Sequence, residues 1–142
     1  MKKVWIAALA ITASLFCLGM GSIDDGEKLK APEPDVSYEV TIVDQSDVSL
    51  KLTKFSVNGR TYLMGQLGRA DMSIDFDKID RMAFFIKEYD LRADVTLKDG
   101  SRAVLAVDKE KPCYGVSAIA DVRIKFKDIK TIEIHGRVKV TP

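Results

Sequence analysis

From residue 37 to near the end of the chain, apolar and polar residues alternate at every second position. Such alternation over windows of five or six residues is typical of half-buried β-strands. No window of eleven or more residues has the apolar spacing and capping residues of a helix. The pattern therefore predicts an all-β fold whose strands contain the runs Tyr38/Val40/Ile42, Val48/Leu50/Leu52, Met72/Ile74/Phe76, Val95/Leu97 and Val122/Ile124/Phe126.

Two dipeptides predict tight turns between these strands. Asn58-Gly59 and Asp99-Gly100 each separate two apolar runs. Both dipeptides tolerate the positive φ angles that two-residue hairpin turns require. We therefore expect the strands on either side of each dipeptide to pair with one another.

The chain also contains an internal repeat. A shift of fifty residues places Asp71–Phe84 over Asp121–Ile134, and Gly65 over Gly115. In both segments the period of two breaks after a phenylalanine, which predicts the same two-residue corner in each copy. Any two alternating strands match to some degree by pattern alone, and that is the alternative explanation. Four pairs within the two segments are identical: Asp71/Asp121, Ile74/Ile124, Phe76/Phe126 and Ile79/Ile129.

The repeat predicts two tandem units of about five short strands each, over residues 37–88 and 89–137. A unit of this size suits a small barrel or meander, but it buries little apolar surface alone. We therefore expect the two units to pack together, with residues 87–90 as the joint between two lobes. The alternative is a single ten-stranded sandwich or barrel in which both copies share one core.

The second copy resembles a known family of small barrels. Its Asp-Gly hairpin over residues 94–101 and its last two strands over residues 122–134 are similar to the Sm-like pattern. The chain also resembles uncharacterised exported bacterial proteins built from tandem units of this kind. The resemblance covers residues 91–135 well and residues 38–86 loosely, and it implies the fold alone. The RNA-contacting motif of Sm proteins is not visible, so no binding residue is carried over.

The first 21 residues predict an export signal, formed as a signal helix. Lys2 and Lys3 precede an uncharged run over residues 4–20, and Gly21–Ser22 suits signal peptidase cleavage. Two alternatives remain open. An uncleaved anchor of seventeen residues reaches about 25 Å, short of the roughly 30 Å hydrocarbon core. Lipidation of Cys17 requires a small residue before it, where the chain has Phe16.

Residues 22–36 carry charges, Gly26 and two prolines without apolar periodicity, which predicts a flexible linker. Together these features predict a protein of the bacterial periplasm or cell envelope. Contact with a membrane is expected only if the signal is retained or Cys17 is lipidated.

Composition narrows the function classes. The chain has 142 residues, of which 46% are hydrophobic and 30% charged, and this excludes wholesale disorder and a multi-span membrane protein. The net charge is +1, and it becomes −1 without Lys2 and Lys3. A nearly neutral chain does not favour nucleic acid as a partner.

The best metal candidates are Asp71, Asp75 and Asp77, because Ca²⁺ prefers several carboxylate oxygens. However, a calcium-loop glycine and terminal glutamate are missing, and the second copy has basic residues in the corresponding places. The charge reversal is explained more simply as a complementary or solubilising surface. We therefore predict no metal and no cofactor.

The second copy carries a basic stripe of Arg123, Lys125, Lys127 and Lys130. This stripe suits an anionic polymer or lipid head groups, although lysines also protect exposed strand edges from unwanted pairing.

Catalytic chemistry has little support in the sequence. Cys113 is the lone cysteine after the signal and is expected to be a buried apolar residue. His135 is the single histidine and should point away from the core. Without a nucleophile–base pair, the chain is not expected to be an enzyme.

The sequence thus favours an exported, non-enzymatic binding module that contacts another envelope protein or an anionic envelope component through strand edges or a groove between lobes. One alternative is a structural or self-assembling envelope protein, for which oligomers are expected. A hydrolase or metal-binding protein that uses the Asp71–Asp80 cluster is the remaining alternative.

Overall fold

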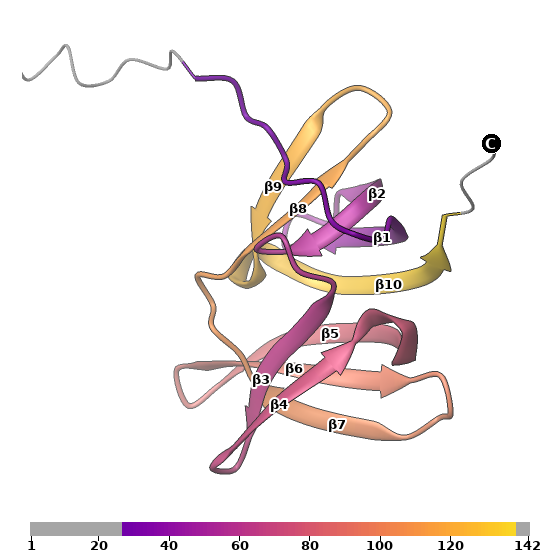
Figure 1. The fold of residues 1–142 in the computed structure, drawn as a ribbon. Coiled ribbons are helices and arrows are strands. Elements are labelled where there is room, and N and C mark those ends of the chain that lie inside the picture. The colour runs from indigo at the N-terminus through magenta and orange to yellow at the C-terminus, as the bar shows by residue number, and fades with distance from the viewer. Residues whose placement is uncertain (1–26, 139–142) are drawn as a thin grey trace, which may run out of the picture.

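The computed structural model describes residues 27–138, and within them the all-β prediction is confirmed (Figure 1). The predicted signal and its cleavage point, Gly21–Ser22, lie outside the described residues. No helix among residues 27–138 is long and apolar enough to cross a membrane. The strands are β1 (Tyr38–Asp44), β2 (Ser49–Val57), β3 (Tyr62–Leu67), β4 (Ala70–Asp75), β5 (Ile79–Lys87), β6 (Asp90–Leu97), β7 (Arg102–Ala106), β8 (Pro112–Val116), β9 (Asp121–Lys125) and β10 (Ile129–Arg137).

All ten strands form one curled antiparallel sheet, rather than two tandem barrels (Figure 1). The strand order is β4-β3-β7-β6-β5-β10-β1-β2-β8-β9. We call the first five strands of this order the first half-sheet and the last five the second half-sheet. Strands β5 and β10 join the halves, and Met82 pairs with Ile132 at their centre. Both side chains are fully buried, so the core is continuous across the joint.

The two repeats exchange their opening hairpins. Strands β1 and β2 of the first repeat lie beside β8, β9 and β10 of the second. Strands β6 and β7 of the second repeat lie beside β3, β4 and β5 of the first. Each half-sheet therefore contains strands from both repeats. The expected pair of self-contained lobes is wrong, and the alternative of a shared core is closer to the structure.

Two sequence expectations fail because of this exchange. Asn58 and Gly59 do form a tight turn with positive φ angles, closed by hydrogen bonds between Val57 and Arg60. However, β2 pairs with β8 while β3 pairs with β4 and β7, so the turn carries the chain between half-sheets. Residues 87–90 are not a joint between lobes. They form a hairpin turn between β5 and β6, in which Lys87 pairs with Asp90.

The other turns form at the predicted places. The strands around Asp99-Gly100, β6 and β7, pair along Arg92–Thr96 as expected. The turn is longer than the predicted two residues, because Leu97 and Ser101 close a loop over residues 98–100, in which Gly100 has a φ of 92° and Asp99 has no positive φ. The predicted corners are two short 3₁₀ turns, η1 (Phe76–Lys78) and η2 (Phe126–Asp128). In each, the phenylalanine is buried and its carbonyl accepts a hydrogen bond from the residue that begins the next strand. The corner thus turns the chain while its aromatic ring fills the core.

The corner phenylalanines bind the two half-sheets together. Phe76 stacks on Phe55 of β2, with 5.4 Å between ring centroids, and meets the edge of Tyr38 at the same distance. Phe126 stacks on Phe84 of β5 at 5.1 Å. Each ring therefore contacts a strand of the opposite half-sheet, and aromatic pairs of this kind add stability beyond the area that they bury.

Candidate functional site

The sheet does not close, and its two end strands are the most prominent unpaired feature of the fold. Within residues 27–138, β4 pairs along one side with β3, and β9 pairs along one side with β8. Each end strand therefore presents a row of backbone N–H and C=O groups without a strand partner. The strands that lie between them are paired on both sides.

The pairing pattern identifies which backbone groups face outward. The amide of Phe76 donates to the carbonyl of Thr61, directly beyond the β3–β4 ladder. Because hydrogen-bonded pairs alternate with non-bonded pairs in an antiparallel ladder, Asp71, Ser73 and Asp75 direct their backbone groups away from β3. The bond from the Phe126 amide to Lys111 likewise places Asp121, Arg123 and Lys125 on the open side of β9.

The open side of β4 is acidic. Asp71 and Asp75 are exposed, while Ile74 between them is buried. The Asp71 carboxylate accepts a hydrogen bond from the Gln66 amide at 3.1 Å. Within residues 27–138 neither carboxylate has a basic partner within ion-pair distance. This edge therefore combines free backbone groups with negative charge.

The open side of β9 is basic. Glu110 forms ion pairs with Lys125 at 2.9 Å and with Lys127 at 3.1 Å, and these two lysines lower the pKa of the Glu110 carboxyl group. Lys130 pairs with Asp47 instead. Arg123 is exposed and has no ion-pair partner among the described side chains. The predicted basic stripe is thus divided, and Arg123 remains as its unpaired charge.

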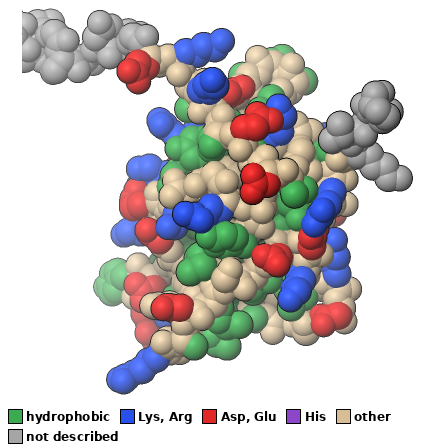
Figure 2. All heavy atoms as spheres, in the orientation of Figure 1, with side chains coloured by type: hydrophobic (Ala, Val, Ile, Leu, Met, Phe, Trp, Pro, Cys, Tyr) green, Lys and Arg blue, Asp and Glu red, His purple; other side chains and the backbone are tan. Residues whose placement is uncertain are grey.

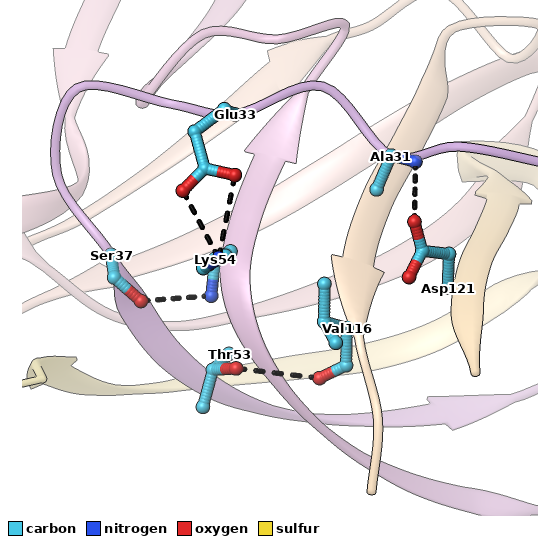
Figure 3. A network of polar contacts seen from close by, with 7 residues as sticks. All are labelled: Ala31, Glu33, Ser37, Thr53, Lys54, Val116 and Asp121. Carbon is cyan, nitrogen blue, oxygen red and sulfur yellow. Dashed lines mark hydrogen bonds and ion pairs between the residues drawn. The ribbon is translucent and has the colours of Figure 1, made fainter. Parts of the chain in front are cut away.

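The N-terminal segment over residues 27–37 lies across β2, β8 and β9 (Figure 3). The Ala31 amide donates to the Asp121 carboxylate at 2.9 Å, and the Lys54 amide donates to the Ser37 hydroxyl at 3.0 Å. Glu33 forms an ion pair with Lys54 at 3.0 Å. These contacts place the end of the predicted linker against the second half-sheet.

Two open hollows flank the edges. One, of about 420 Å³, lies between residues 27–30 and the pair Tyr114 and Arg123 on β8 and β9. The other, of about 430 Å³, lies beside β3 and includes Asp71, Asp90, Asp108 and Lys111. Charged and apolar side chains are interspersed over the face in Figure 2. The second hollow was missed by sequence reasoning because only the hairpin exchange brings β7 beside β3.

The three acidic metal candidates do not gather. Asp71 and Asp75 lie on β4, whereas Asp77 lies in η1 and is held by two other groups. Over residues 27–138, no three His, Cys, Asp or Glu side chains stand close enough to hold a metal ion.

Asp77 instead joins the first corner to the second half-sheet. The Tyr38 hydroxyl donates to its Oδ1 at 2.7 Å, and Arg137 Nε donates to the same oxygen at 2.9 Å. Hydrogen bonds from Arg137 and Tyr38 lower the pKa of Asp77 to about 2. Burial, and then the bond to Asp77, raises the pKa of Tyr38. This cluster links β1, η1 and β10, and its carboxylate is committed to that link.

The two residues considered for catalysis lie apart. Cys113 is fully buried in β8, and burial raises the pKa of its thiol. A thiol in this state is a poor nucleophile, because the thiolate is the reactive form. His135 lies exposed on β10, and its Nε2 is 2.7 Å from the Thr41 hydroxyl. The expected positions of Cys113 inside and His135 outside are confirmed.

The comparisons with known proteins place the domain in a family. The searches of curated proteins and of solved structures found no match. A family model described as an uncharacterised protein matches residues 34–137, which include all ten strands. The chain therefore belongs to this uncharacterised protein family.

Proposed function

We propose that this chain is an exported, non-enzymatic interaction module of the bacterial cell envelope. In this proposal it binds another envelope protein by accepting an extended segment at β4 or β9. The observation that carries the proposal is the open sheet, whose two end strands are unpaired on one side within residues 27–138. The export part rests on the charge pattern of residues 1–21.

Strand addition is a common way for an open sheet to bind a partner. The partner's backbone supplies the missing hydrogen bonds, and its alternating side chains meet those of the edge strand. On β4 the outward backbone groups of Asp71, Ser73 and Asp75 follow one another at every second residue. On β9 the corresponding positions include Arg123 and Lys125, which favour an acidic segment or an anionic envelope component.

The state of the reactive side chains supports a non-enzymatic role. Cys113 has a raised pKa and no exposure, and Asp77 is engaged by Tyr38 and Arg137. The carboxylate of Asp77 is therefore not free to serve the hydrolase considered for the Asp71–Asp80 cluster.

The test compares edge strands that have their outward-facing N–H group with edge strands that lack it. The wild-type full chain and two variants of it, Ser73→Pro and Arg123→Pro, are each kept in mild detergent and cross-linked to proteins of an envelope extract. Proline removes the amide donor but is tolerated on edge strands. Ser73→Ala and Arg123→Ala are the matched controls, because they shorten the side chain and keep the N–H.

We expect one proline variant to capture about one tenth as much partner as the wild type, or less, while its alanine control captures as much as the wild type. The loss of an edge contact worth about 1.4 kcal/mol weakens binding by this factor. Circular dichroism checks that each variant keeps its strands. Capture that is unchanged by both prolines, or that never exceeds background, contradicts the proposal.

A further inference from the structure

The two open edges have opposite charge at equivalent places in the repeat. Asp71, Ser73 and Asp75 on β4 correspond, fifty residues later, to Asp121, Arg123 and Lys125 on β9. At the second and third positions a hydroxyl and a carboxylate are replaced by two basic groups. The edges therefore differ most in charge at the positions whose backbone groups are unpaired.

The two edges also fit one another in geometry. An antiparallel arrangement that sets Asp75 opposite Arg123 also sets Ser73 opposite Lys125, and all four direct their backbone groups outward. The same register places Ile74 opposite Ile124, both on the inward-facing side of their strands. Opposite charges and apolar pairs on facing strands are both stabilising in a sheet.

The charged groups that this pairing needs are available. Within the described part of the chain, Asp75 and Arg123 have no ion-pair partner, and both are exposed. Lys125 shares Glu110 with Lys127, so Glu110 keeps one lysine if Lys125 turns to a new carboxylate. Asp121 is the one acid on the β9 edge, and the Ala31 amide already occupies its carboxylate.

We propose that these two edges also bind each other, with β4 of one molecule paired to β9 of a second copy of this chain. The proposal rests on the open edges invoked for the proposed function, and it adds self-assembly to the binding of an envelope partner. Because two different surfaces meet, the contact is head-to-tail, and each added molecule presents a new free edge. The product is a chain of molecules that continues the sheet from one copy to the next.

The test uses charge reversal on one edge at a time. Asp71→Lys with Asp75→Lys makes both edges basic, and Arg123→Glu with Lys125→Glu makes both acidic. We expect the wild-type full chain in mild detergent to form a concentration-dependent ladder of oligomers in sedimentation velocity. Each reversed variant alone should remain monomeric, and an equimolar mixture of the two should assemble again, because each contact then joins opposite charges.

Circular dichroism and thermal melting establish that both variants fold. A wild-type chain that stays monomeric at about millimolar concentration overturns the inference, as does a mixture that fails to assemble. Assembly that survives reversal in either variant alone also overturns it, because a symmetric or apolar contact is then responsible. The proposed function is judged separately by the proline variants: loss of a captured envelope protein other than this chain supports it, whether or not the wild type self-assembles.

Discussion

The two half-sheets have the same plan but are held together differently at one pair of equivalent seams, where an exchanged hairpin meets the two outermost strands of its half-sheet. In the second half-sheet, β2 and β8 are joined by three ladder pairs, from Thr53↔Val116 to Val57↔Cys113. In the first half-sheet, β3 and β7 share the single pair Gln66↔Ala106. The second half-sheet is also crossed by residues 27–37, as Figure 3 shows. A shared fold thus leaves one seam firm and the other weakly paired.

Both seams depend on a glycine at the same repeat position. A Cβ on Gly65 would stand 2.9 Å from Leu105 Cβ, and a Cβ on Gly115 would stand 2.9 Å from Leu52 Cβ. In each case the leucine belongs to the other repeat's exchanged hairpin. The glycines therefore allow the exchange, because only a residue without a side chain permits so close an approach.

The largest effect is expected from Gly115→Ala, which should lower the free energy of unfolding by about 2–3 kcal/mol, the cost of overpacking a close-packed core. Three atoms of Leu52 lie within 3.3 Å of the added Cβ, and the ladder prevents the strands from separating. Gly65→Ala should cost about 1 kcal/mol less, because β3 and β7 are joined by a single ladder pair and can move apart more easily to make room for the added methyl group. Urea denaturation measures both.

A second substitution identifies the cause. Leu52→Ala keeps the Cβ but removes Cγ and Cδ1, two of the three close atoms, so Gly115→Ala combined with Leu52→Ala should cost less than the sum of the single changes. Simple additivity would contradict a clash with the end of the Leu52 side chain, and an equal loss at Gly65 and Gly115 would contradict the difference between the seams.

Local patterns predict the elements of this fold well and its pairing poorly. Alternation places Val40, Ile42 and Ile74 inside, and the break after Phe76 predicts the corner at η1. Asn58-Gly59 predicts a turn, and a turn forms there. Which strand lies beside β2 depends on contacts with β8, more than fifty residues away, and no local signal reports them.

The same division applies to the candidate site. The charge reversal between Asp75 and Lys125 is visible in the sequence, as is the outward direction of both side chains. That β4 and β9 are the end strands follows from the hairpin exchange, so the sequence alone did not identify them as the open edges. The sequence groups Asp77 with Asp71 and Asp75, although its partners Tyr38 and Arg137 lie on strands β1 and β10.

The corner of the first repeat should respond to acid through Asp77. Its pKa is lowered from 3.8 to about 2, so the carboxylate stabilises the fold above pH 4 and loses this effect as the pH falls towards 2. The side chain is 45% exposed, so solvent screening limits the contribution to about 1 kcal/mol or less.

Asp77→Asn should therefore reduce the loss of stability between pH 4 and pH 2, measured by thermal melting across that range. Asp71→Asn is the matched control, because Asp71 forms no ion pair within residues 27–138 and accepts a hydrogen bond from Gln66 instead. The melting temperature of this variant should fall with decreasing pH in the same way as that of the wild type. An Asp77→Asn profile identical to that of the wild type would show that the link to Arg137 adds nothing.

The smallest effect is expected at the corresponding corner of the second repeat. There Lys127 replaces Asp77, and it meets Glu110 together with Lys125 on the protein surface. The lysines lower the pKa of Glu110. The ionised carboxylate therefore stabilises the fold at neutral pH, and this stabilisation is lost as the pH falls below the usual pKa range of a glutamate. Exposed pairs of this kind contribute little, because solvent and salt screen them.

Glu110→Gln should therefore shift the melting temperature at neutral pH by about one degree or less, well below the shift for Asp77→Asn. The same substitution frees Lys125 for the carboxylates of a neighbouring β4 strand, so self-association should strengthen while stability hardly changes. A marked loss of stability would mean that the second corner depends on its ion pair as the first depends on Asp77. In that case the two corners would be equivalent in energy as well as in shape.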